Sequence, residues 1–413
     1  MNILIKDILL YDKTVDVLIE DNKFKTIGKV DTTKTKIDKT INGKDKAILP
    51  AFYNLHCHAA MNILRGFCED LPLFEWLQNI WKKEDTLKGE DIYNGTRLAI
   101  LEMIKSGTVF FADMYWFHKD VIRAAKDMGI RADVGLTFMN KLDRKTIDEN
   151  FDFLNNYSKD KNEIVKVSPT PHAIYTCDDK LYKECYDNAK KNNLFLQTHL
   201  CETEQEVNDC KKAHNGMTPV EYLDNAGVLD NNTIAAHCVY LTENDSKILA
   251  NRGVVLVHNP CSNMKLSSGV FNMPQNRKYN CKIALGTDGT SSNNNLSMME
   301  EMKMACLLAK VSFKKADALT ANEIFDIATK KGAEYYNINA GEIKEGMQAD
   351  CIIVDLNNER MVPNYNIIYN MVYSADSTCI NGVICNGKIL MEDRHVDNEQ
   401  EIIEIAKRYN AKN

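Results

Sequence analysis

The stretch Ala47-Ile48-Leu49-Pro50-Ala51-Phe52-Tyr53-Asn54-Leu55-His56-Cys57-His58 leads an apolar run directly into two histidines. Successive side chains of a β-strand point to opposite faces, so His56 and His58, two residues apart at a strand end, point to the same side. One divalent metal ion can therefore bind both imidazoles. A His-x-His pair alone is a weak signal, and its weight depends on the rest of the chain.

Apolar runs of this kind recur along the chain, separated by longer amphipathic segments. Most are apolar throughout, as expected for parallel strands that are buried on both faces. The segment Asp91–Lys105 has helical spacing, and Thr203 with Glu206, Ser297 with Glu300 and Thr320 with Glu323 match the capping box that opens a helix. Strand and helix repeated eight times predict an α/β fold, a (β/α)8 TIM barrel. The eight runs are Lys46–Pro50, Thr108–Met114, Arg131–Leu136, Ile164–Ser168, Leu194–His199, Thr233–Cys238, Gly253–His258 and Lys282–Asp288.

The two ends of the chain have a different pattern, with short strands and turn residues such as Asn42-Gly43. Neither end is long enough to bury a good core alone. We therefore expect both ends to fold together into a small β-sandwich beside the barrel. The predicted division is residues 1–50 and 345–413 for the sandwich and residues 51–344 for the metal-dependent barrel, with a closing helix from about Glu399.

Composition excludes several classes of partner. The chain has 413 residues, a formal net charge of −7 and neither a basic block nor an arginine-rich stretch, which argues against nucleic acid and against anionic membranes. Its 13 cysteines form no C-x-x-C pair, as expected for free thiols in a reducing cytoplasm. Residues Met1–Asp7 alternate apolar and polar side chains, so we expect a strand there and no signal peptide.

Reactive groups of barrel enzymes lie at the C-terminal ends of the strands. Alone, a histidine at a strand end is more often a core or turn residue, and an aspartate before glycine is usually a turn residue. Here five of the nine histidines fall at such strand ends, together with one aspartate, and chance does not explain that placement. These residues are His56, His58, His172, His199, His237 and Asp288. Imidazole nitrogens with one carboxylate suit one divalent metal ion, Zn²⁺ first, with Fe²⁺ or Mn²⁺ as alternatives.

Glu202 lies three residues after His199, just past the predicted strand end. A carboxyl group there can sit beside the metal site without binding the metal, as a proton shuttle must. The alternative interpretation is an acidic residue in the first turn of the next helix.

Together these residues resemble the amidohydrolase superfamily, in its mononuclear-metal deaminase branch. Longer segments are similar to 5-methylthioadenosine/S-adenosylhomocysteine deaminases, and the resemblance runs from residue 1 to about residue 395. The motifs that carry it are His56-Cys57-His58, His199-x-x-Glu202, His237, Leu71–Leu77, His258–Leu266 and Gly286–Asn294.

The resemblance implies a role for each matching position. The implied metal ligands are His56, His58, His199 and Asp288, with one metal ion because no lysine motif for a bridging carbamate is present. Glu202 would protonate the ring nitrogen beside the amino-bearing carbon, and His237 with Asp288 would orient and deprotonate the attacking water. The implied substrate contacts are His172, Ser292, Glu202 and, for the ribose hydroxyls, Glu84. Trp76, in the apolar segment Phe67–Trp81 that we expect to cover the site, is a further candidate contact.

The implied reaction is hydrolytic deamination of 5′-methylthioadenosine, 5′-deoxyadenosine, adenosine or S-adenosylhomocysteine to the inosine analogue and ammonia, in a cytoplasmic homo-oligomer. Family members that take S-adenosylhomocysteine carry arginines after the third barrel strand, where this chain has Phe138 and Met139, with Arg144 slightly shifted. An apolar 5′ group is therefore favoured. The alternatives are a related deaminase or hydrolase of guanine, another purine, a pterin or an s-triazine, and a binding protein that has lost catalysis.

Overall fold

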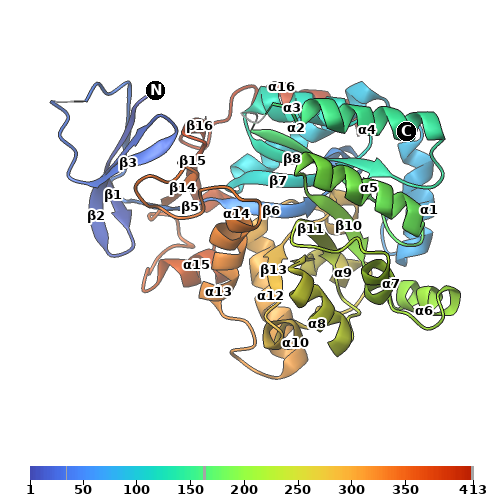
Figure 1. Ribbon diagram of the computed structural model, residues 1–413. Coiled ribbons are helices and arrows are strands. Elements are labelled where there is room, and N and C mark those ends of the chain that lie inside the picture. The colour runs from blue at the N-terminus through green and yellow to red at the C-terminus, as the bar shows by residue number, and fades with distance from the viewer. Residues whose placement is uncertain (34, 161–163, 411–413) are drawn as a thin grey trace.

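The computed structural model describes residues 1–33, 35–160 and 164–410. Helices surround a set of parallel strands, and a β-rich lobe that carries the N-terminus lies beside this body (Figure 1).

Eight parallel strands form the centre of the body, in two four-stranded sheets with the orders β6-β7-β8-β9 and β10-β11-β12-β13. Nearly every residue in them is buried, which explains why the strands are apolar throughout rather than alternating. The bounds are β6 (Phe52–Cys57), β7 (Thr108–Tyr115), β8 (Arg131–Phe138), β9 (Val165–Pro171), β10 (Leu196–Leu200), β11 (Thr233–His237), β12 (Val255–His258) and β13 (Lys282–Leu285).

Backbone hydrogen bonds join the two sheets at both edges. His199 N donates to His172 O at 3.0 Å, between β10 and the end of β9, and Thr287 N donates to His56 O at 3.1 Å, between the end of β13 and β6. Residues that follow these strands are thus brought to one shared end of the two sheets.

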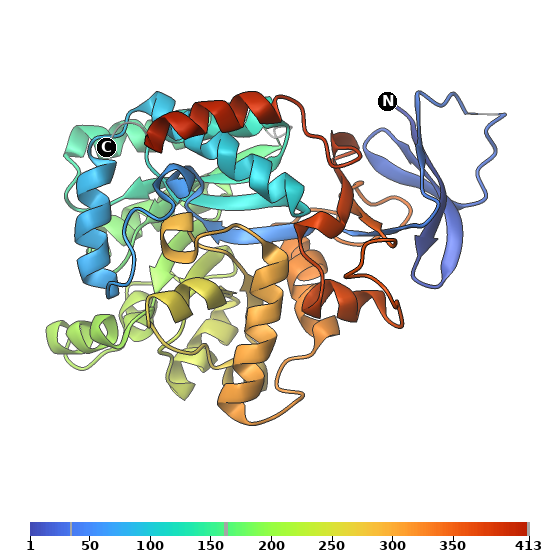
Figure 2. The ribbon, with the colours of Figure 1, turned by 180° about the vertical axis from the view of Figure 1, so that it is seen from behind.

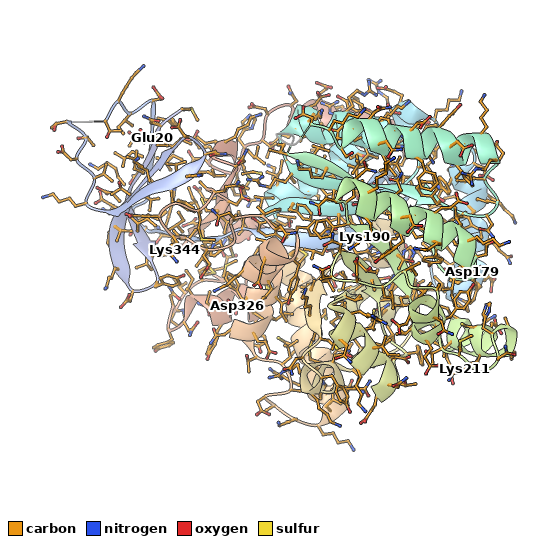
Figure 3. All side chains as sticks on the ribbon, in the orientation of Figure 1. Glu20, Asp179, Lys190, Lys211, Asp326 and Lys344 are labelled. Atoms are coloured by element: carbon orange, nitrogen blue, oxygen red, sulfur yellow. The ribbon has the colours of Figure 1, made fainter. Side chains whose placement is uncertain are left out.

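The helices cover the outside of the strands (Figures 1 and 2). In α5, for example, Leu181 and Cys185 are buried, whereas Asp179 and Lys190, labelled in Figure 3, are exposed. The larger helices are α1 (Leu73–Glu84), α2 (Gly89–Lys105), α3 (His118–Met128), α4 (Arg144–Tyr157), α5 (Asp179–Asn192), α6 (Glu204–Ala213), α8 (Glu243–Arg252), α12 (Met298–Phe313) and α16 (Glu399–Asn410). Shorter helical segments are η1 (Ala59–Leu64), α7 (Pro219–Asn225), α9 (Pro260–Lys265), α10 (Met273–Lys278), α11 (Thr290–Asn293), α13 (Ala321–Asp326), η2 (Ile327–Lys331), α14 (Gly332–Tyr335), α15 (Ile367–Tyr373) and η3 (Ser377–Cys379).

Both ends of the chain contribute to one further sheet, with strand order β16-β15-β14-β5-β1-β2-β3 and β4 paired with β1. It has its own apolar core, which includes Ile5, Phe24, Ile48 and Ile353. The bounds are β1 (Ile3–Leu10), β2 (Lys13–Glu20), β3 (Lys23–Gly28), β4 (Lys39–Asn42), β5 (Lys46–Pro50), β14 (Cys351–Asp355), β15 (Ile380–Cys385) and β16 (Lys388–Met391).

The first predicted barrel run was assigned to the wrong sheet. Lys46–Pro50 is β5 of the outer sheet, antiparallel to β14, and the first strand of the parallel set is Phe52–Cys57. The physical reason is that β5 is buried on both sides, so its composition does not differ from that of a central parallel strand. Helix α16 begins at Glu399 and packs along α2 (Figure 2), with Arg97 Nη1 3.0 Å from Glu401 Oε1.

A buried polar cluster joins the outer sheet to the parallel strands. The carboxylate of Asp350, which is fully buried, accepts hydrogen bonds from Arg131 Nε (2.9 Å) and Tyr53 OH (2.6 Å). Asn386 N donates to its other oxygen at 2.5 Å. Every oxygen of the buried carboxylate thus has a partner, as a buried charge requires.

None of the helices in the described ranges has the length and apolarity needed to cross a bilayer. All thirteen cysteines lie in described segments, and each is a free thiol.

Candidate metal centre and active site

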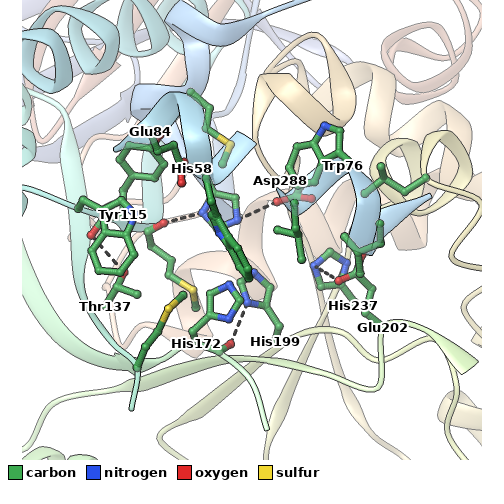
Figure 4. Close-up of a pocket in the computed structure, with 18 of the residues that line it drawn as sticks. His58, Trp76, Glu84, Tyr115, Thr137, His172, His199, Glu202, His237 and Asp288 are labelled. Atoms are coloured by element: carbon green, nitrogen blue, oxygen red, sulfur yellow. Dashed lines mark hydrogen bonds and ion pairs between the residues drawn. The ribbon is translucent and has the colours of Figure 1, made fainter. Parts of the chain in front are cut away.

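Four histidines and one aspartate meet at the shared end of the two parallel sheets. Figure 4 shows His58, His199, His237 and Asp288 among them. The ring centroid of His56 lies 5.0 Å from the ring centroids of His58 and His199 and 5.5 Å from that of His237. Asp288 Oδ1 lies 3.4 Å from His56 Nε2 and 3.1 Å from His58 Nε2. Two groups have ligand atoms within 4.8 Å of one another, and both contain His56: one adds His199 and His237, the other His58 and Asp288.

The strand ends explain how these side chains converge. His56 belongs to β6, His199 to β10 and His237 to β11. His58 directly follows β6, and Asp288 lies three residues after the end of β13. His237 and Asp288 have positive φ angles of 73° and 61°, a left-handed backbone that non-glycine residues rarely adopt. Such strain persists where the surrounding structure fixes it, and it is frequent at functional sites.

Backbone carbonyls orient two of the imidazoles. His58 Nδ1 lies 2.5 Å from Met114 O, and His199 Nδ1 lies 2.8 Å from His172 O. A carbonyl oxygen only accepts, so each Nδ1 carries a proton, and Nε2 is the ring atom left to bind a metal. Metal-binding histidines in proteins usually have this arrangement.

The donor atoms fit a divalent cation. His56 Nε2 and Asp288 Oδ1 are buried and have no hydrogen-bonding partner among the described residues, although a buried polar atom without a partner costs about 1–3 kcal/mol. Three imidazole nitrogens and one carboxylate oxygen around a common point would satisfy them together when they bind one metal ion.

Two serine hydroxyls hold the other oxygen of Asp288. Ser262 Oγ donates to Asp288 Oδ2 at 2.6 Å and Ser292 Oγ donates to the same oxygen at 2.8 Å. Burial raises the pKa of the Asp288 carboxyl, but the imidazoles of His56 and His58 outweigh burial and hold this pKa well below its usual range. Asp288 is therefore a carboxylate at neutral pH.

Glu202 faces His237 across the site. Its Oε2 lies 3.7 Å from His237 Nε2, and its Oε1 accepts a hydrogen bond from Ser268 Oγ at 3.2 Å. Burial, with the negative charges of Asp288 and Glu206, raises the pKa of Glu202 well above its usual value. The raised pKa favours the protonated form of Glu202, which is the form able to donate a proton.

His237 differs from the other imidazoles in its partner. Asn263 Nδ2 lies 2.9 Å from His237 Nδ1, and an amide nitrogen donates, so Nδ1 accepts and the ring proton is on Nε2. Burial lowers the pKa of His237 to about 3, so the ring is neutral. Its Nε2–H points toward Glu202 (Figure 4).

A cavity opens above this cluster, and α1 forms one wall of it through Trp76, Trp81 and Glu84. Glu84 Oε1 and Trp76 Nε1 are buried and have no hydrogen-bonding partner among the described residues, so both are available to a ligand. His172 also lines the cavity, and burial lowers its pKa to about 3. The remaining wall is largely apolar or aromatic, with Met61, Leu73, Leu77, Met114, Tyr115, Trp116, Met139, Tyr175 and Leu266.

Ser292 and Phe138, which were expected at the substrate, lie elsewhere, and Arg144 does not line the cavity. Ser292 does not line the cavity, because the first turn of α11 directs its hydroxyl to Asp288. Phe138 is fully buried and stacks on Phe151 at 4.7 Å. Arg144 lies on the surface, where it pairs with Asp148 and Glu184.

Residues 47–390 match the sequence profile of the amidohydrolase family. The chain belongs to the amidohydrolase family. It is 41% identical, over 98% of its length and 97% of the relative, to a 5′-deoxyadenosine deaminase of Methanosphaera stadtmanae. It is 42% identical, over 95% of its length and 94% of the relative, to a 5-methylthioadenosine/S-adenosylhomocysteine deaminase of Thermococcus sibiricus. A crystal structure of an adenosine deaminase from Xanthomonas campestris with bound zinc superposes with a TM-score of 0.93 at 28% identity, covering 99% of this chain and 97% of that one.

Several polar residues of this amidohydrolase site were not predicted. Ser262 and Asn263 lie in the segment His258–Leu266, which is one of the motifs of the family resemblance. The resemblance assigned no role to either residue. Ser268 and Glu206 have no sequence signal that separates them from ordinary loop and capping residues. Ser268 reaches Glu202 through the packing of a distant loop, and Glu206 reaches the backbone of Glu202 through the fold of the turn before α6.

Proposed function

We propose that this chain is a metal-dependent aminohydrolase that converts adenosine-type nucleosides to their inosine analogues and releases ammonia. The observation that carries the proposal is a pair of buried carboxyl groups beside a histidine cluster, with the pKa of Glu202 shifted upward and that of Asp288 shifted downward. Deamination needs both, because one group must protonate the purine while another takes protons from water.

The proposed ligands are His56, His58, His199 and Asp288, which would hold one divalent ion per subunit, Zn²⁺ first and Fe²⁺ or Mn²⁺ as alternatives. When bound, the ion makes hydroxide available at neutral pH. Their fit is supported by the unpartnered atoms of His56 and Asp288.

Each remaining step belongs to the chain's own residues. Glu202 donates its proton to the ring nitrogen beside the amino-bearing carbon, which makes that carbon easier to attack. His237 Nε2–H orients the attacking water, and Asp288 takes a proton from it and passes it to the departing amine. One water is consumed: the carbon–nitrogen bond breaks, ammonia leaves, and the second proton of the water returns to Glu202 as the carbonyl forms.

Substrate recognition follows from the cavity wall. We assign Glu84 to the ribose hydroxyls and Trp76 and His172 to further contacts with the nucleoside. Met114 and Met139 favour an apolar 5′ group, since Arg144 is held on the surface by two carboxylates.

The experiment is a comparison of kcat/KM for ammonia release from 5′-deoxyadenosine, 5′-methylthioadenosine, adenosine, S-adenosylhomocysteine and guanine. We expect the two apolar 5′ substrates to react fastest and guanine not to react. Activity on guanine alone would refute the assignment. A preference for S-adenosylhomocysteine would refute the apolar 5′ specificity and would point to Lys141, whose ammonium lies 5.4 and 5.3 Å from the rings of Trp81 and Trp116.

We further propose that the two parallel sheets close into one (β/α)8 barrel over residues 51–344, with residues 1–50 and 345–413 forming the β-sandwich part. The two backbone hydrogen bonds between the sheets support closure. The free cysteines support a cytoplasmic location, and the exposed Leu307 and Val311 of α12 support a homo-oligomer. Light scattering of the purified protein tests the oligomeric state.

A further inference from the structure

The start of α6 departs from its predicted capping box. Thr203 Oγ1 accepts a hydrogen bond from Glu206 N at 3.2 Å, which is the first half of the motif. In the second half, the carboxylate would accept from the backbone N–H of Thr203. Instead, Glu206 Oε1 accepts from Cys201 N at 2.9 Å and Glu206 Oε2 accepts from Glu202 N at 2.8 Å.

The next helix provides the ordinary arrangement. At the start of α7, Glu221 Oε2 accepts a hydrogen bond from Thr218 N at 2.9 Å, and Thr218 Oγ1 accepts from Glu221 N at 3.1 Å. The same residue types, three apart, therefore close a reciprocal box there. The Glu206 carboxylate instead accepts from the backbone N–H groups one and two residues before Thr203, in the turn that carries Glu202.

That turn needs support, because Cys201 has a φ angle of 53°, in the left-handed region. On one side, Val239 N and Tyr240 N donate to Cys201 O at 3.0 and 2.9 Å. On the other side, the Glu206 carboxylate accepts the two N–H groups. Hydrogen bonds to a charged group are roughly twice as strong as neutral ones. The backbone of Glu202 is thus fixed from both sides.

Glu206 is itself 3% exposed, and a buried carboxylate is costly unless its surroundings compensate it. Burial raises its pKa to about 7, against the backbone hydrogen bonds that lower it. Its charge also contributes to the raised pKa of Glu202. A partly exposed cap such as Glu221 would hold the helix at a lower cost, so the burial of Glu206 points to a role at Glu202.

We propose that Glu206 is a positioning residue that holds the backbone of Glu202 so that its carboxyl group is aimed at the substrate ring. The inference rests on the proposed function, in which Glu202 donates a proton. Glu206 touches neither the substrate cavity nor the histidine cluster; it acts through Glu202.

The test uses the full-length, metal-loaded protein with Glu206→Gln and the matched control Glu221→Gln. A glutamine amide accepts one backbone N–H but presents its own N–H₂ to the other, so the turn loses one hydrogen bond and gains a repulsive contact. We expect kcat of Glu206→Gln to fall by about 10- to 100-fold, as for a small misplacement of a catalytic group, with KM and metal content unchanged. Glu221→Gln keeps wild-type kcat.

A double variant separates positioning from general destabilisation. If Glu206 acts through Glu202, adding Glu206→Gln to Glu202→Gln lowers the residual rate no further, because the proton is already lost. If the two losses multiply, Glu206 acts elsewhere and the inference is wrong.

Hydrogen exchange provides a readout that does not need activity. Peptides that contain Cys201 and Glu202 should exchange faster in Glu206→Gln than in the wild type, and peptides around Thr218 should not change. Unchanged exchange at the two amides overturns the inference. If wild-type protein releases no ammonia but these amides still exchange faster, the proposed function fails while the contact of Glu206 stands.

Discussion

Glu202→Gln separates catalysis from folding and metal binding in this site. Glu202 is 4% exposed and its pKa lies well above its usual value because of burial and of the charges of Asp288 and Glu206, which favours the neutral, protonated form of the native side chain. The substitution replaces one neutral, hydrogen-bonding group by another of nearly the same shape. Ser268 Oγ, which donates to Glu202 Oε1, keeps an acceptor.

The expected loss is therefore confined to proton transfer. General acid catalysis contributes about 10²–10⁴-fold, which is about 2.7–5.4 kcal/mol of transition-state stabilisation. We expect kcat/KM to fall by about that factor, while the thermal midpoint and the metal content stay at wild-type values. Glu204→Gln, at an exposed position two residues further along, is the matched control and should keep full activity.

The direction of the pH dependence follows from the raised pKa of Glu202. Because Glu202 acts in its protonated form, kcat/KM of the wild type is flat below the raised pKa and falls about tenfold per pH unit above it. A carboxylate acting as a base would instead give a rate that rises with pH. The assay is ammonia release from 5′-deoxyadenosine across the pH range. For the variant, the refuting result is a Glu202→Gln protein that keeps its metal and has a kcat/KM within threefold of wild type.

Two further predictions concern the neighbours of the site and the junction. Ser262→Ala removes one of the two hydroxyl donors to Asp288 Oδ2, so metal affinity should fall by about 10- to 100-fold. Competition with a chelating dye measures this affinity, and an unchanged value would contradict the role of the hydrogen bond. Arg131→Ala leaves the fully buried Asp350 without its cation and should lower the free energy of unfolding by about 3–5 kcal/mol, measured by denaturant titration, whereas Arg144→Ala on the surface should leave the midpoint unchanged.

Periodicity predicted the parallel strands well, because continuous burial leaves a continuous apolar run. It failed where two kinds of buried strand have the same composition. Lys46–Pro50 and Phe52–Cys57 follow each other almost without a break, yet β5 pairs with β14 at the far end of the chain and β6 with β7. Pairing partners so distant in sequence leave no local signal.

The candidate site also contains residues whose place could be predicted from the sequence and residues whose place could not. The histidines and Asp288 were predictable because metal ligands must be particular residue types at strand ends. Ser292 was misplaced because a serine three residues after Gly289 fits a cavity wall and a helix turn equally well. Glu206 was predicted as a helix cap, and only the fold of the turn before it directs its carboxylate to the amides of Cys201 and Glu202.

The most direct test of the metal centre is an X-ray absorption spectrum of the zinc-loaded protein at one ion per chain. Convergence of His56, His58, His199 and Asp288 predicts three imidazole ligands with zinc–nitrogen distances of about 2.0–2.1 Å, and oxygen in the remaining positions. Fewer than three imidazoles, or a sulfur ligand from one of the 13 cysteines, would contradict it.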